Sequence, residues 1–480
     1  MGSTVPTTRC MGQNLDDVNE TRVSLRNENS QSSSVVSAVS SPRVVSPQAS
    51  WRVMPATAGD QPAILQLLVS VFHRPSPVDF HTQQEDPSYE PADRLLIKSG
   101  RTIVAHLRIL HREMRFGNLI LPVGLITDVA TLPEFRHQGC ATALMAAARE
   151  ALSRQGAVLG LLRTEIPRFY ARRGWVVCGR HSYAVAAPRE ILSCLHQRET
   201  ESARQAEFAL DRAPRPTYGI RVWRQVELAA LRRLYADQTQ SSFGALVRSD
   251  AYWQWLVRRG GNEQIYVAIA GPDRGELDDN VSPIVAYAAT REGRILELMC
   301  APEHPEAATQ LLARVCGEAI ERDFHHVRLD AAPNDRLPAT FLSAGGIHAR
   351  HEVDKGLVFM ANVYRPRRLL KLLAPTLIDR LQEAEIRCPC QLGLLVNEEK
   401  YRLVVSRRQV QFEPGSAGRS YLRCTSYDIA QLLLGHLDIQ DALASGRLTA
   451  STGVAAELAA ALFPRLPLWR SPWDELPAPA

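Results

Sequence analysis

The hydrophobic residues of this chain follow helix and strand periods from about residue 51 onward. An amphipathic helix is expected up to Phe72, because its apolar residues recur at three- and four-residue spacing. The elements expected after it are strands at 94–98, 102–110 and 119–131, a helix at 142–155, a strand at 157–162, a short helix at 167–173 and one strand at 175–186. This alternation predicts an α/β (α+β) fold for residues 51–195.

A second unit at residues 217–365 repeats the order of the first. Residues 341–347 and 169–175 share a phenylalanine, a glycine and a final apolar residue. This alignment sets Leu342 against Tyr170. The chain is therefore expected to contain two copies of one fold.

The second copy lacks features that its counterpart has. The segment before its helix contains Glu303, His304 and Glu306 and has no glycine, so negative charge stands where the first copy has a basic, glycine-containing loop. We expect the second copy to be degenerate and to serve as scaffold.

The rest of the chain divides by composition. Residues 1–50 are rich in serine and asparagine without periodicity, which predicts disorder. Residues 196–216 are polar and read as a linker, and residues 366–480 form a third unit with a tail. Its expected elements are a helix at 369–385, a hairpin of 391–396 and 401–405, a strand at 410–413, and helices at 426–434, 439–444 and 453–463.

Composition narrows the class of protein. The 480 residues are 45% hydrophobic and 22% charged, and the net charge of +5 is dispersed, which argues against a nucleic-acid partner. No apolar run is long enough to span a membrane, and we see no secretory signal. Nine scattered cysteines favour a reducing cytoplasm, and Cys388-Pro-Cys390 has no histidine cluster beside it, so no metal is expected.

The chemistry is expected where the strand ending at Thr131 passes through a basic loop into a helix. Gly139 lets the backbone approach an anion closely, and the exposed N–H groups of a helix N-terminus bind phosphate. Arg136 adds positive charge, and Cys140 and Ala141 are small. The spacing is neither a dinucleotide fingerprint nor a P-loop. An ordinary strand-to-helix turn is the alternative.

The pattern Arg136-x-x-Gly139-x-Ala141 resembles the pyrophosphate loop of the GCN5-related N-acetyltransferases (GNATs). The order of elements in both copies resembles that fold, and the third unit resembles a sterol-carrier-like domain. Together, residues 51 to about 476 resemble the enhanced intracellular survival (Eis) family, in which acetyl-coenzyme A (acetyl-CoA) acetylates amines. The resemblance also implies a homo-oligomer, commonly a hexamer.

The resemblance implies a set of cofactor-binding residues. Backbone groups of the strand end would bind the pantetheine arm, and the loop and first helical turn would bind the diphosphate. A Ser-Glu pair of the family has Thr164 and Glu165 as its counterpart here, one residue further from Tyr170. The implied residues are Val129, Ala130, Thr131, Arg136, His137, Gln138, Gly139, Cys140, Ala141, Thr142, Thr164 and Glu165.

Acetyl transfer to an amine needs an acid and a base. A neutral amine attacks the thioester, a backbone N–H near Val129 can stabilise the oxyanion, and the leaving thiolate needs a proton. Tyr170, with an ordinary pKa of about 10, can donate it; the alternative is a packing role. Asp128, Glu165 and the chain terminus are candidate bases.

In the Eis family the C-terminal carboxylate serves as the base. The tail here extends past the expected end through Pro477, which stiffens it. Asp474 or Glu475 is therefore expected to replace the carboxylate of Ala480 as base.

The stretch 76–93 is expected to be a loop that borders the acceptor site. It carries Asp79, Glu85, Asp86 and two further carboxylates, with no Lys or Arg. These charges favour a cationic small-molecule or peptide amine such as an aminoglycoside, a polyamine or a lysine-like group; a solvated acidic loop is the alternative. A different function also stays open, in which the third unit binds an apolar ligand and both acetyltransferase units are inactive scaffold.

Overall fold

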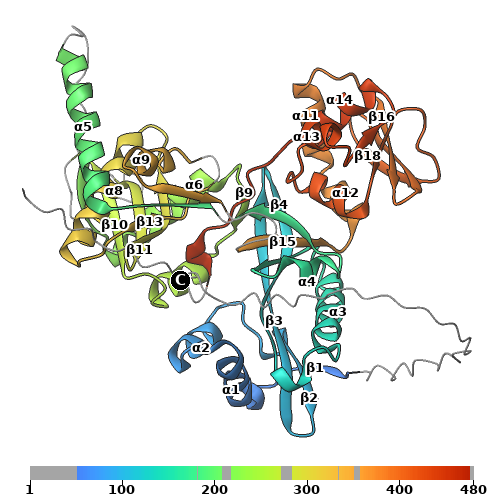
Figure 1. Ribbon diagram of the computed structural model, residues 1–480, viewed down its shortest axis with the longest axis horizontal. Helices are drawn as coiled ribbons and strands as arrows, with labels where there is room; N and C mark the ends of the chain where they lie inside the picture. Colours follow the sequence, from blue (N-terminus) through green and yellow to red (C-terminus); the bar gives the residue numbers. More distant parts are fainter. Residues whose placement is uncertain are drawn as a thin grey trace, which may run out of the picture. The chain divides into compact units, whose positions relative to one another are not determined.

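A computed structural model describes residues 51–180, 182–207, 218–271, 284–332, 335–350 and 357–475. These residues form three β-sheets with helices packed against them (Figure 1). The segment 1–50, expected to be disordered, lies outside the described residues.

The first sheet has the strand order β1-β2-β3-β4-β5-β15-β6, and β9 pairs with β3 at its end. Its strands are β1 (Val53–Pro55), β2 (Arg94–Ser99), β3 (Thr102–Phe116), β4 (Leu119–Thr131), β5 (Leu159–Thr164), β6 (Val176–Arg180), β9 (Phe243–Leu246) and β15 (Val358–Val363). Its helices are α1 (Gln61–Phe72), α2 (Pro77–Gln84), α3 (Cys140–Arg154) and α4 (Pro167–Ala171).

The prediction of a loop across 76–93 is wrong at its start, where α2 forms. Ser76 is the N-cap of α2, and its hydroxyl accepts a hydrogen bond from the Asp79 N–H at 3.1 Å. Pro77 follows at the first helical position, where its missing N–H costs nothing. The low hydrophobicity of this helix hid it from a search for apolar periods.

The second sheet has the order β8-β10-β11-β12-β13-β7-β14. Its strands are β7 (Ser182–Ala186), β8 (Tyr218–Val222), β10 (Gln264–Ala270), β11 (Ile284–Arg291), β12 (Arg294–Cys300), β13 (Val327–Leu329) and β14 (Ile347–Arg350). Its helices are α5 (Pro188–Glu207), α6 (Leu228–Thr239), α7 (Asp250–Arg258), α8 (Pro305–Glu321) and α9 (Pro338–Ser343).

The two sheets match strand for strand and exchange one strand each. Among the described strands, each sheet has one parallel pair, in its middle: β4 with β5 and β12 with β13. The next position in the first sheet is filled by β15, and the same position in the second sheet by β7 (Figure 1). Each sequence unit therefore completes the sheet of the other.

The single strand expected at 175–186 is consequently wrong. Val176, Val177 and Cys178 are all buried in the first sheet, whereas β7 pairs with β13 and β14 in the second. Both parts carry apolar residues, so the sequence pattern contains no sign that the strand changes sheets. The division into contiguous domains stays a prediction.

The third sheet has the order β18-β17-β16-β19-β20. Its elements are α10 (Pro366–Leu372), α11 (Ala374–Glu383), β16 (Cys390–Val396), β17 (Glu399–Val405), β18 (Val410–Pro414), β19 (Tyr421–Cys424), α12 (Ser426–Leu433), α13 (Ile439–Ala444), β20 (Thr449–Ala450) and α14 (Gly453–Leu462). The helix expected at 369–385 is split near Pro375, which lacks a backbone donor. The likeness to sterol-carrier domains stays a prediction.

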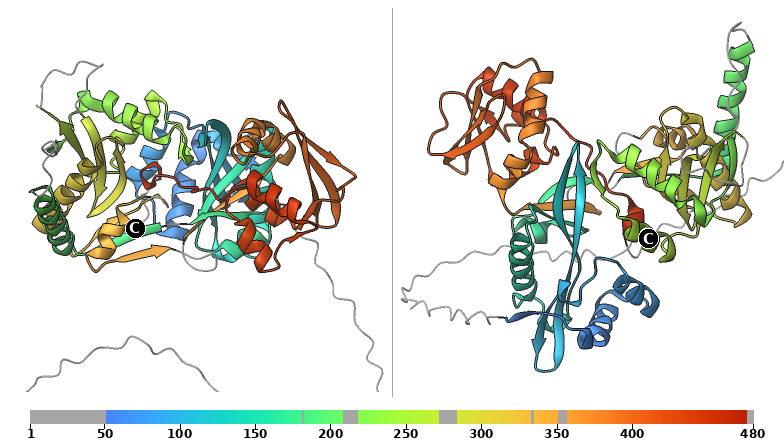
Figure 2. Two further views of the ribbon diagram at one scale, coloured as in Figure 1. Left: turned by 90° about the horizontal axis from the view of Figure 1, so that it is seen from above. Right: turned by 180° about the vertical axis from the view of Figure 1, so that it is seen from behind.

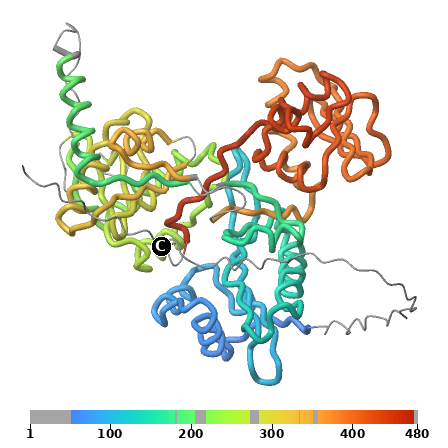
Figure 3. The backbone as a smooth tube through the Cα atoms, viewed as in Figure 1, coloured from blue at the N-terminus to red at the C-terminus, as the bar shows by residue number. Residues whose placement is uncertain are grey.

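After α14 the tail runs back to the other two sheets, as the red segment in Figures 2 and 3. Trp469 donates its backbone N–H to the Phe243 carbonyl at 2.8 Å. A Cβ at Gly244 would lie 2.3 Å from the Trp469 carbonyl oxygen, so only glycine permits this approach. The tail ends in a short helical turn, η5 (Pro472–Asp474), with the Trp473 side chain fully buried.

Candidate active site

Strand β4 has a bulge near its C-terminal end. Ala130 pairs with His106 and Thr127 with Arg108, so two β4 residues, Asp128 and Val129, face one residue of β3. Asp128 adopts a φ of 53°, a conformation that aspartate tolerates better than most residues. Bulges re-aim the backbone and end strand pairing, and they are common beside active sites.

Beyond the bulge β4 and β5 are no longer paired. Their parallel register joins Val123–Leu125 with Leu159–Leu161 and stops there, although β4 continues to Thr131 and β5 to Thr164. The ends of two neighbouring strands therefore lack each other as hydrogen-bonding partners. Such an edge can accept an extended ligand as an added strand.

The loop after β4 has the conformation expected of an anion site. Gly139 is the N-cap of α3 with a φ of 86°, and a Cβ there would meet no atom within 4 Å. The Trp51 indole donates to the Gln138 carbonyl at 2.7 Å, and Gln138 Nε2 donates to the Glu134 carbonyl at 2.8 Å. Arg136, His137 and Gln138 are exposed, whereas Cys140 is buried beneath them. The fixed loop thus leaves the helix N-terminus open to a phosphate.

Tyr170 lies on α4 against the core of the first sheet. Its side chain is 7% exposed, and its ring makes edge contacts with Phe169 and Trp175 at centroid distances of 4.9 and 6.2 Å. Burial raises the pKa of Tyr170 to about 12, partly offset by the charge of Arg173. The phenol therefore stays protonated at neutral pH.

The expected pair Thr164-Glu165 divides into one buried and one exposed residue. Thr164 ends β5, and its hydroxyl accepts a hydrogen bond from the Ile166 N–H at 3.0 Å. Glu165 is exposed. Thr164 shapes the turn into α4, and among the described residues no hydrogen bond or ion pair fixes the Glu165 carboxylate at the bulge.

In the second copy the counterpart of Tyr170 is a phenylalanine, Phe341, and not Leu342 as expected. Gly174 and Gly345 both have positive φ, and each follows an aromatic residue by four positions. This turn aligns Tyr170 with Phe341, which is fully buried, whereas Leu342 is 51% exposed. The alignment of Leu342 with Tyr170 is therefore wrong by one residue.

Polar residues buried beneath the bulge hold Asp128. His106 donates from Nδ1 to the Asp128 carbonyl at 2.8 Å, and its Nε2 lies 3.2 Å from Arg94 Nη1. Burial and the Arg94 charge lower the pKa of His106 to about 3, so the ring is neutral. Sequence reasoning missed both residues, although a histidine and an arginine in the apolar strands β3 and β2 were a visible signal.

The Asp128 carboxylate has one oxygen without a hydrogen bond among the described residues. Its Oδ1 accepts from the Thr127 hydroxyl at 3.2 Å, and Arg94 Nη1 lies 3.7 Å from Oδ2. The buried Oδ2 has no hydrogen-bond partner among the described residues. A carboxylate that is oriented but not saturated can accept a proton or an amine.

The carboxylates of the stretch 76–93 are mostly engaged locally. Asp79 caps α2 through Ser76, Asp86 forms a buried ion pair with Arg112, and Asp93 accepts from His111 at 3.1 Å. Glu85 and Glu90 are exposed. Fewer carboxylates of this stretch are therefore free to attract a cation than the sequence suggests.

The tail carboxylates lie in ion pairs. Both oxygens of Asp474 accept from Arg248, at 2.9 and 3.0 Å, and the two side chains are 0% exposed. Glu475 pairs with Arg163 and with Arg470. Ala480 lies outside the described residues. These contacts argue against the expectation that Asp474 or Glu475 is the base.

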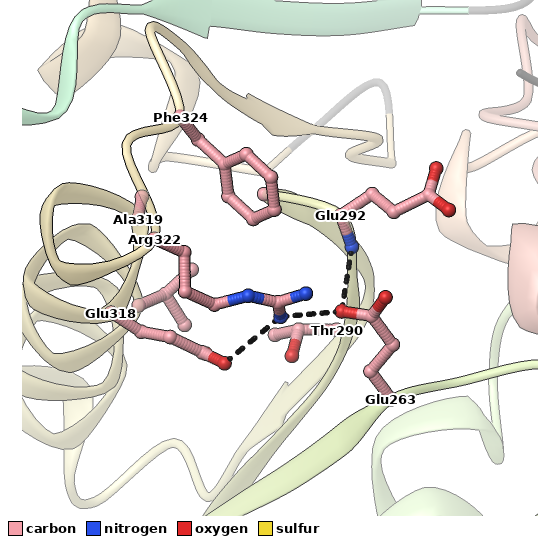
Figure 4. A pocket seen from close by; sticks show the side chains of 9 residues that line it. Glu263, Thr290, Glu292, Glu318, Ala319, Arg322 and Phe324 are labelled. Carbon is pink, nitrogen blue, oxygen red and sulfur yellow. Dashed lines mark hydrogen bonds and ion pairs between the residues drawn. The ribbon is translucent and has the colours of Figure 1, made fainter.

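A small pocket lies elsewhere, in the second unit (Figure 4). Its centre is filled by Arg322, which pairs with Glu263 at 2.6 Å and with Glu318 at 3.3 Å. It contains none of the predicted site residues, and the Arg322 charge is balanced by Glu263 and Glu318. Across the described ranges there is no cluster of metal-binding side chains and no helix able to cross a membrane.

Comparison with known proteins agrees with this geometry. Residues 52–178 match the family described as acetyltransferase (GNAT) domain. A comparison with curated proteins gives no significant match.

Three solved structures share the fold over most of the chain. A GCN5-related N-acetyltransferase from Anabaena variabilis is 16% identical, with a TM-score of 0.64 over 88% of this chain and 99% of its own. One from Kribbella flavida is 17% identical, with a TM-score of 0.62 over 87% and 97%. Eis1 from Mycobacterium abscessus is 14% identical, with a TM-score of 0.56 over 86% and 97%. Similarity at identities this low shows the fold alone. The domain match at residues 52–178 identifies the chain as an acyltransferase with a GNAT domain.

Proposed function

We propose that this enzyme transfers the acetyl group of acetyl-CoA to an amine, with its active site at the end of β4. The observation that carries the proposal is the continuous path from the β4 bulge, past the unpaired ends of β4 and β5, to the open loop at Gly139. GNAT domains use acetyl-CoA as co-substrate. The phosphate-binding loop and the unpaired strand edge fit such a molecule.

Each part of this path has a task in the proposal. The backbone of Val129, Ala130 and Thr131 holds the pantetheine arm, and residues 136–142 hold the diphosphate. The Val129 N–H stabilises the oxyanion that forms when the amine attacks the thioester carbonyl. Tyr170 then protonates the departing sulfur. The burial that raises the pKa of Tyr170 also disfavours a bare thiolate, so proton transfer remains productive.

We propose Asp128 as the group that takes the proton of the incoming amine. It is one residue from Val129, its backbone is fixed by His106, and one of its oxygens has no hydrogen-bond partner among the described residues. Asp128 is also ion-paired, with Arg94 at 3.7 Å, but its side chain is 18% exposed. The side chain of Asp474 is 0% exposed, and both of its oxygens accept from Arg248. An amine whose ammonium form pairs with Asp128 and passes the exposed Glu85 and Glu90 is favoured as acceptor, which keeps a cationic amine as the proposed substrate class.

Titration with acetyl-CoA in a thermal-shift assay tests the proposal. Binding to the native state must raise Tm by mass action, and millimolar ligand should do so clearly. No shift, together with stabilisation by an apolar ligand, would favour the alternative of a ligand-binding protein with inactive acetyltransferase units.

Gly139→Glu should abolish the shift caused by acetyl-CoA. The new carboxylate would repel the diphosphate, and a side chain at a φ of 86° is strained. Gly139→Ala is the matched control, since its Cβ would enter open space and adds the strain alone. Equal loss of binding in both variants would show that backbone strain, rather than charge at a phosphate site, is responsible.

Asp128→Asn should lower kcat/KM at pH 7 by about 10²- to 10⁴-fold, the usual range for a lost general base. Asparagine tolerates the positive φ, so the bulge should persist. The deficit should shrink as pH approaches the pKa of the amine, because free amine then needs no base. Glu165→Gln, which changes an exposed carboxylate five residues before Tyr170, should have little effect. If Glu165→Gln is the damaging change, the roles are reversed.

A further inference from the structure

Arg173 joins the helix that carries Tyr170 to the start of α3. Its Nε and Nη2 donate to the Thr142 hydroxyl at 3.1 and 2.8 Å, and its Nη1 donates to the Phe169 carbonyl at 2.5 Å. The guanidinium lies 3.9 Å from the centre of the Phe169 ring. Thr142 is in the first turn of α3, two residues after its first residue, Cys140. These contacts hold a positive charge beside the open loop.

This position is electrostatically unfavourable without a further partner. A helix N-terminus carries a partial positive charge, so a cation there is repelled, whereas an anion is stabilised. Among the described residues no carboxylate lies within ion-pair distance of Arg173, and the groups that accept its side-chain hydrogen bonds are a hydroxyl and a carbonyl, both neutral. Arg136 adds a second cation at the same loop, donating to the Thr131 carbonyl at 3.4 Å. The two guanidinium groups lack an anion.

We propose that Arg173 is a phosphate ligand of the coenzyme A moiety, supplying the charged donor that the glycine loop itself lacks. The inference rests on the proposed function and names a residue that the loop pattern does not include. Arginine suits the task because its planar donors match phosphate oxygens in pairs. The donors now turned to Thr142 are exposed enough to be shared with a phosphate, since Thr142 is at the surface.

The same contacts connect cofactor binding with the acid. The Tyr170 carbonyl accepts from the Arg173 N–H at 2.8 Å and from the Trp175 N–H at 3.3 Å. A phosphate held by Arg173 is therefore held by the turn that ends the Tyr170 helix. The sulfur end and the phosphate end of one ligand thus contact a segment of four residues.

The adjacent Arg172 provides a matched control. It is exposed and has the same charge, so replacing either arginine by glutamine changes the net charge equally. Arg173→Gln should weaken CoA binding about 10- to 100-fold, the range for a lost hydrogen bond to a charged group. Arg172→Gln should change it by less than about threefold, and Arg173→Lys, which keeps the charge, should lie between. Isothermal titration with CoA measures all three.

Two further ligands identify the source of the effect. Acetyl-pantetheine has no phosphate, so wild type and Arg173→Gln should turn it over with the same kcat/KM. With 3′-dephospho-CoA, a persisting penalty assigns Arg173 to the diphosphate and a vanishing one assigns it to the 3′-phosphate. Equal CoA affinities for Arg173→Gln and Arg172→Gln, with unchanged Tm, would overturn the inference. Failure of wild type to bind CoA at all would instead refute the proposed function.

Discussion

Tyr170→Phe should lower kcat by about 10²- to 10⁴-fold while leaving CoA binding unchanged. The substitution removes only the hydroxyl, and the ring can keep its contacts with Phe169 and Trp175. The second copy shows that a phenylalanine can pack at this position, because the buried Phe341 occupies the same turn there. Steady-state thiol release at saturating acetyl-CoA measures kcat, and titration measures binding.

Tyr364→Phe is the matched control for this variant. Tyr364 packs in the same core cluster, is also 7% exposed, and its buried hydroxyl has no hydrogen-bond partner among the described residues. Removing that hydroxyl should leave kcat within about threefold of wild type. If the two variants lose activity equally, the loss comes from disturbed packing and the role of Tyr170 as acid is refuted.

The pH profile gives an independent reading of the same role. Burial raises the pKa of Tyr170 to about 12, so the protonated acid persists throughout the working range and is lost only above it. The wild-type kcat/KM should therefore rise with pH as the amine deprotonates and show no falling limb between about pH 7 and 10. A descending limb with a pKa near 9 that disappears in Tyr170→Phe would contradict the raised pKa.

Local patterns predicted the parts of the site that depend on neighbours in sequence. The bounds expected for β4, 119–131, agree with the structure, and α3 begins two residues before the expected start. The loop between them leads into the helix N-terminus at Gly139, which has a positive φ, a feature encoded within a few residues. The bounds expected for α13, 439–444, also agree with the structure, because its N-cap Asp438 directly precedes a short apolar period.

Features that depend on distant partners were not predictable. The exchange of β7 and β15 requires knowing which of two similar sheets each strand joins, and apolar residues in a strand do not indicate which sheet it joins. The sequence shows that His106 stands in an apolar strand, but its partner, the Asp128 carbonyl, is known only from the bulge that brings it to the ring. The ion pair of Asp474 with Arg248 could not be anticipated either, because the two residues are 226 positions apart, and a base role for Asp474 stays a prediction that this contact disfavours.

Asp474→Ala should destabilise the enzyme by about 3–5 kcal/mol, the cost of removing one partner from a buried ion pair. Arg248 lies fully buried between the carboxylates of Asp474 and Glu297, with Nη1 and Nη2 donating to Glu297 at 2.9 and 2.6 Å. Burial alone would disfavour the charged guanidinium, but the two carboxylates outweigh it and raise the pKa of Arg248. Without Asp474, the buried Arg248 guanidinium keeps only one of its two carboxylate partners, Glu297. The midpoint of urea unfolding measures the effect.

Asp474→Asn separates this anchoring role from catalysis. The amide keeps the shape and one acceptor but removes the charge, so part of the stability should be lost while the tail stays in place through the buried Trp473. If Asp474 only anchors the tail, the variant should keep its kcat at a temperature where it is folded. If Asp474 is the base, the variant should be nearly inactive at pH 7 despite being folded, and its activity should return as pH approaches the pKa of the amine, because free amine needs no base.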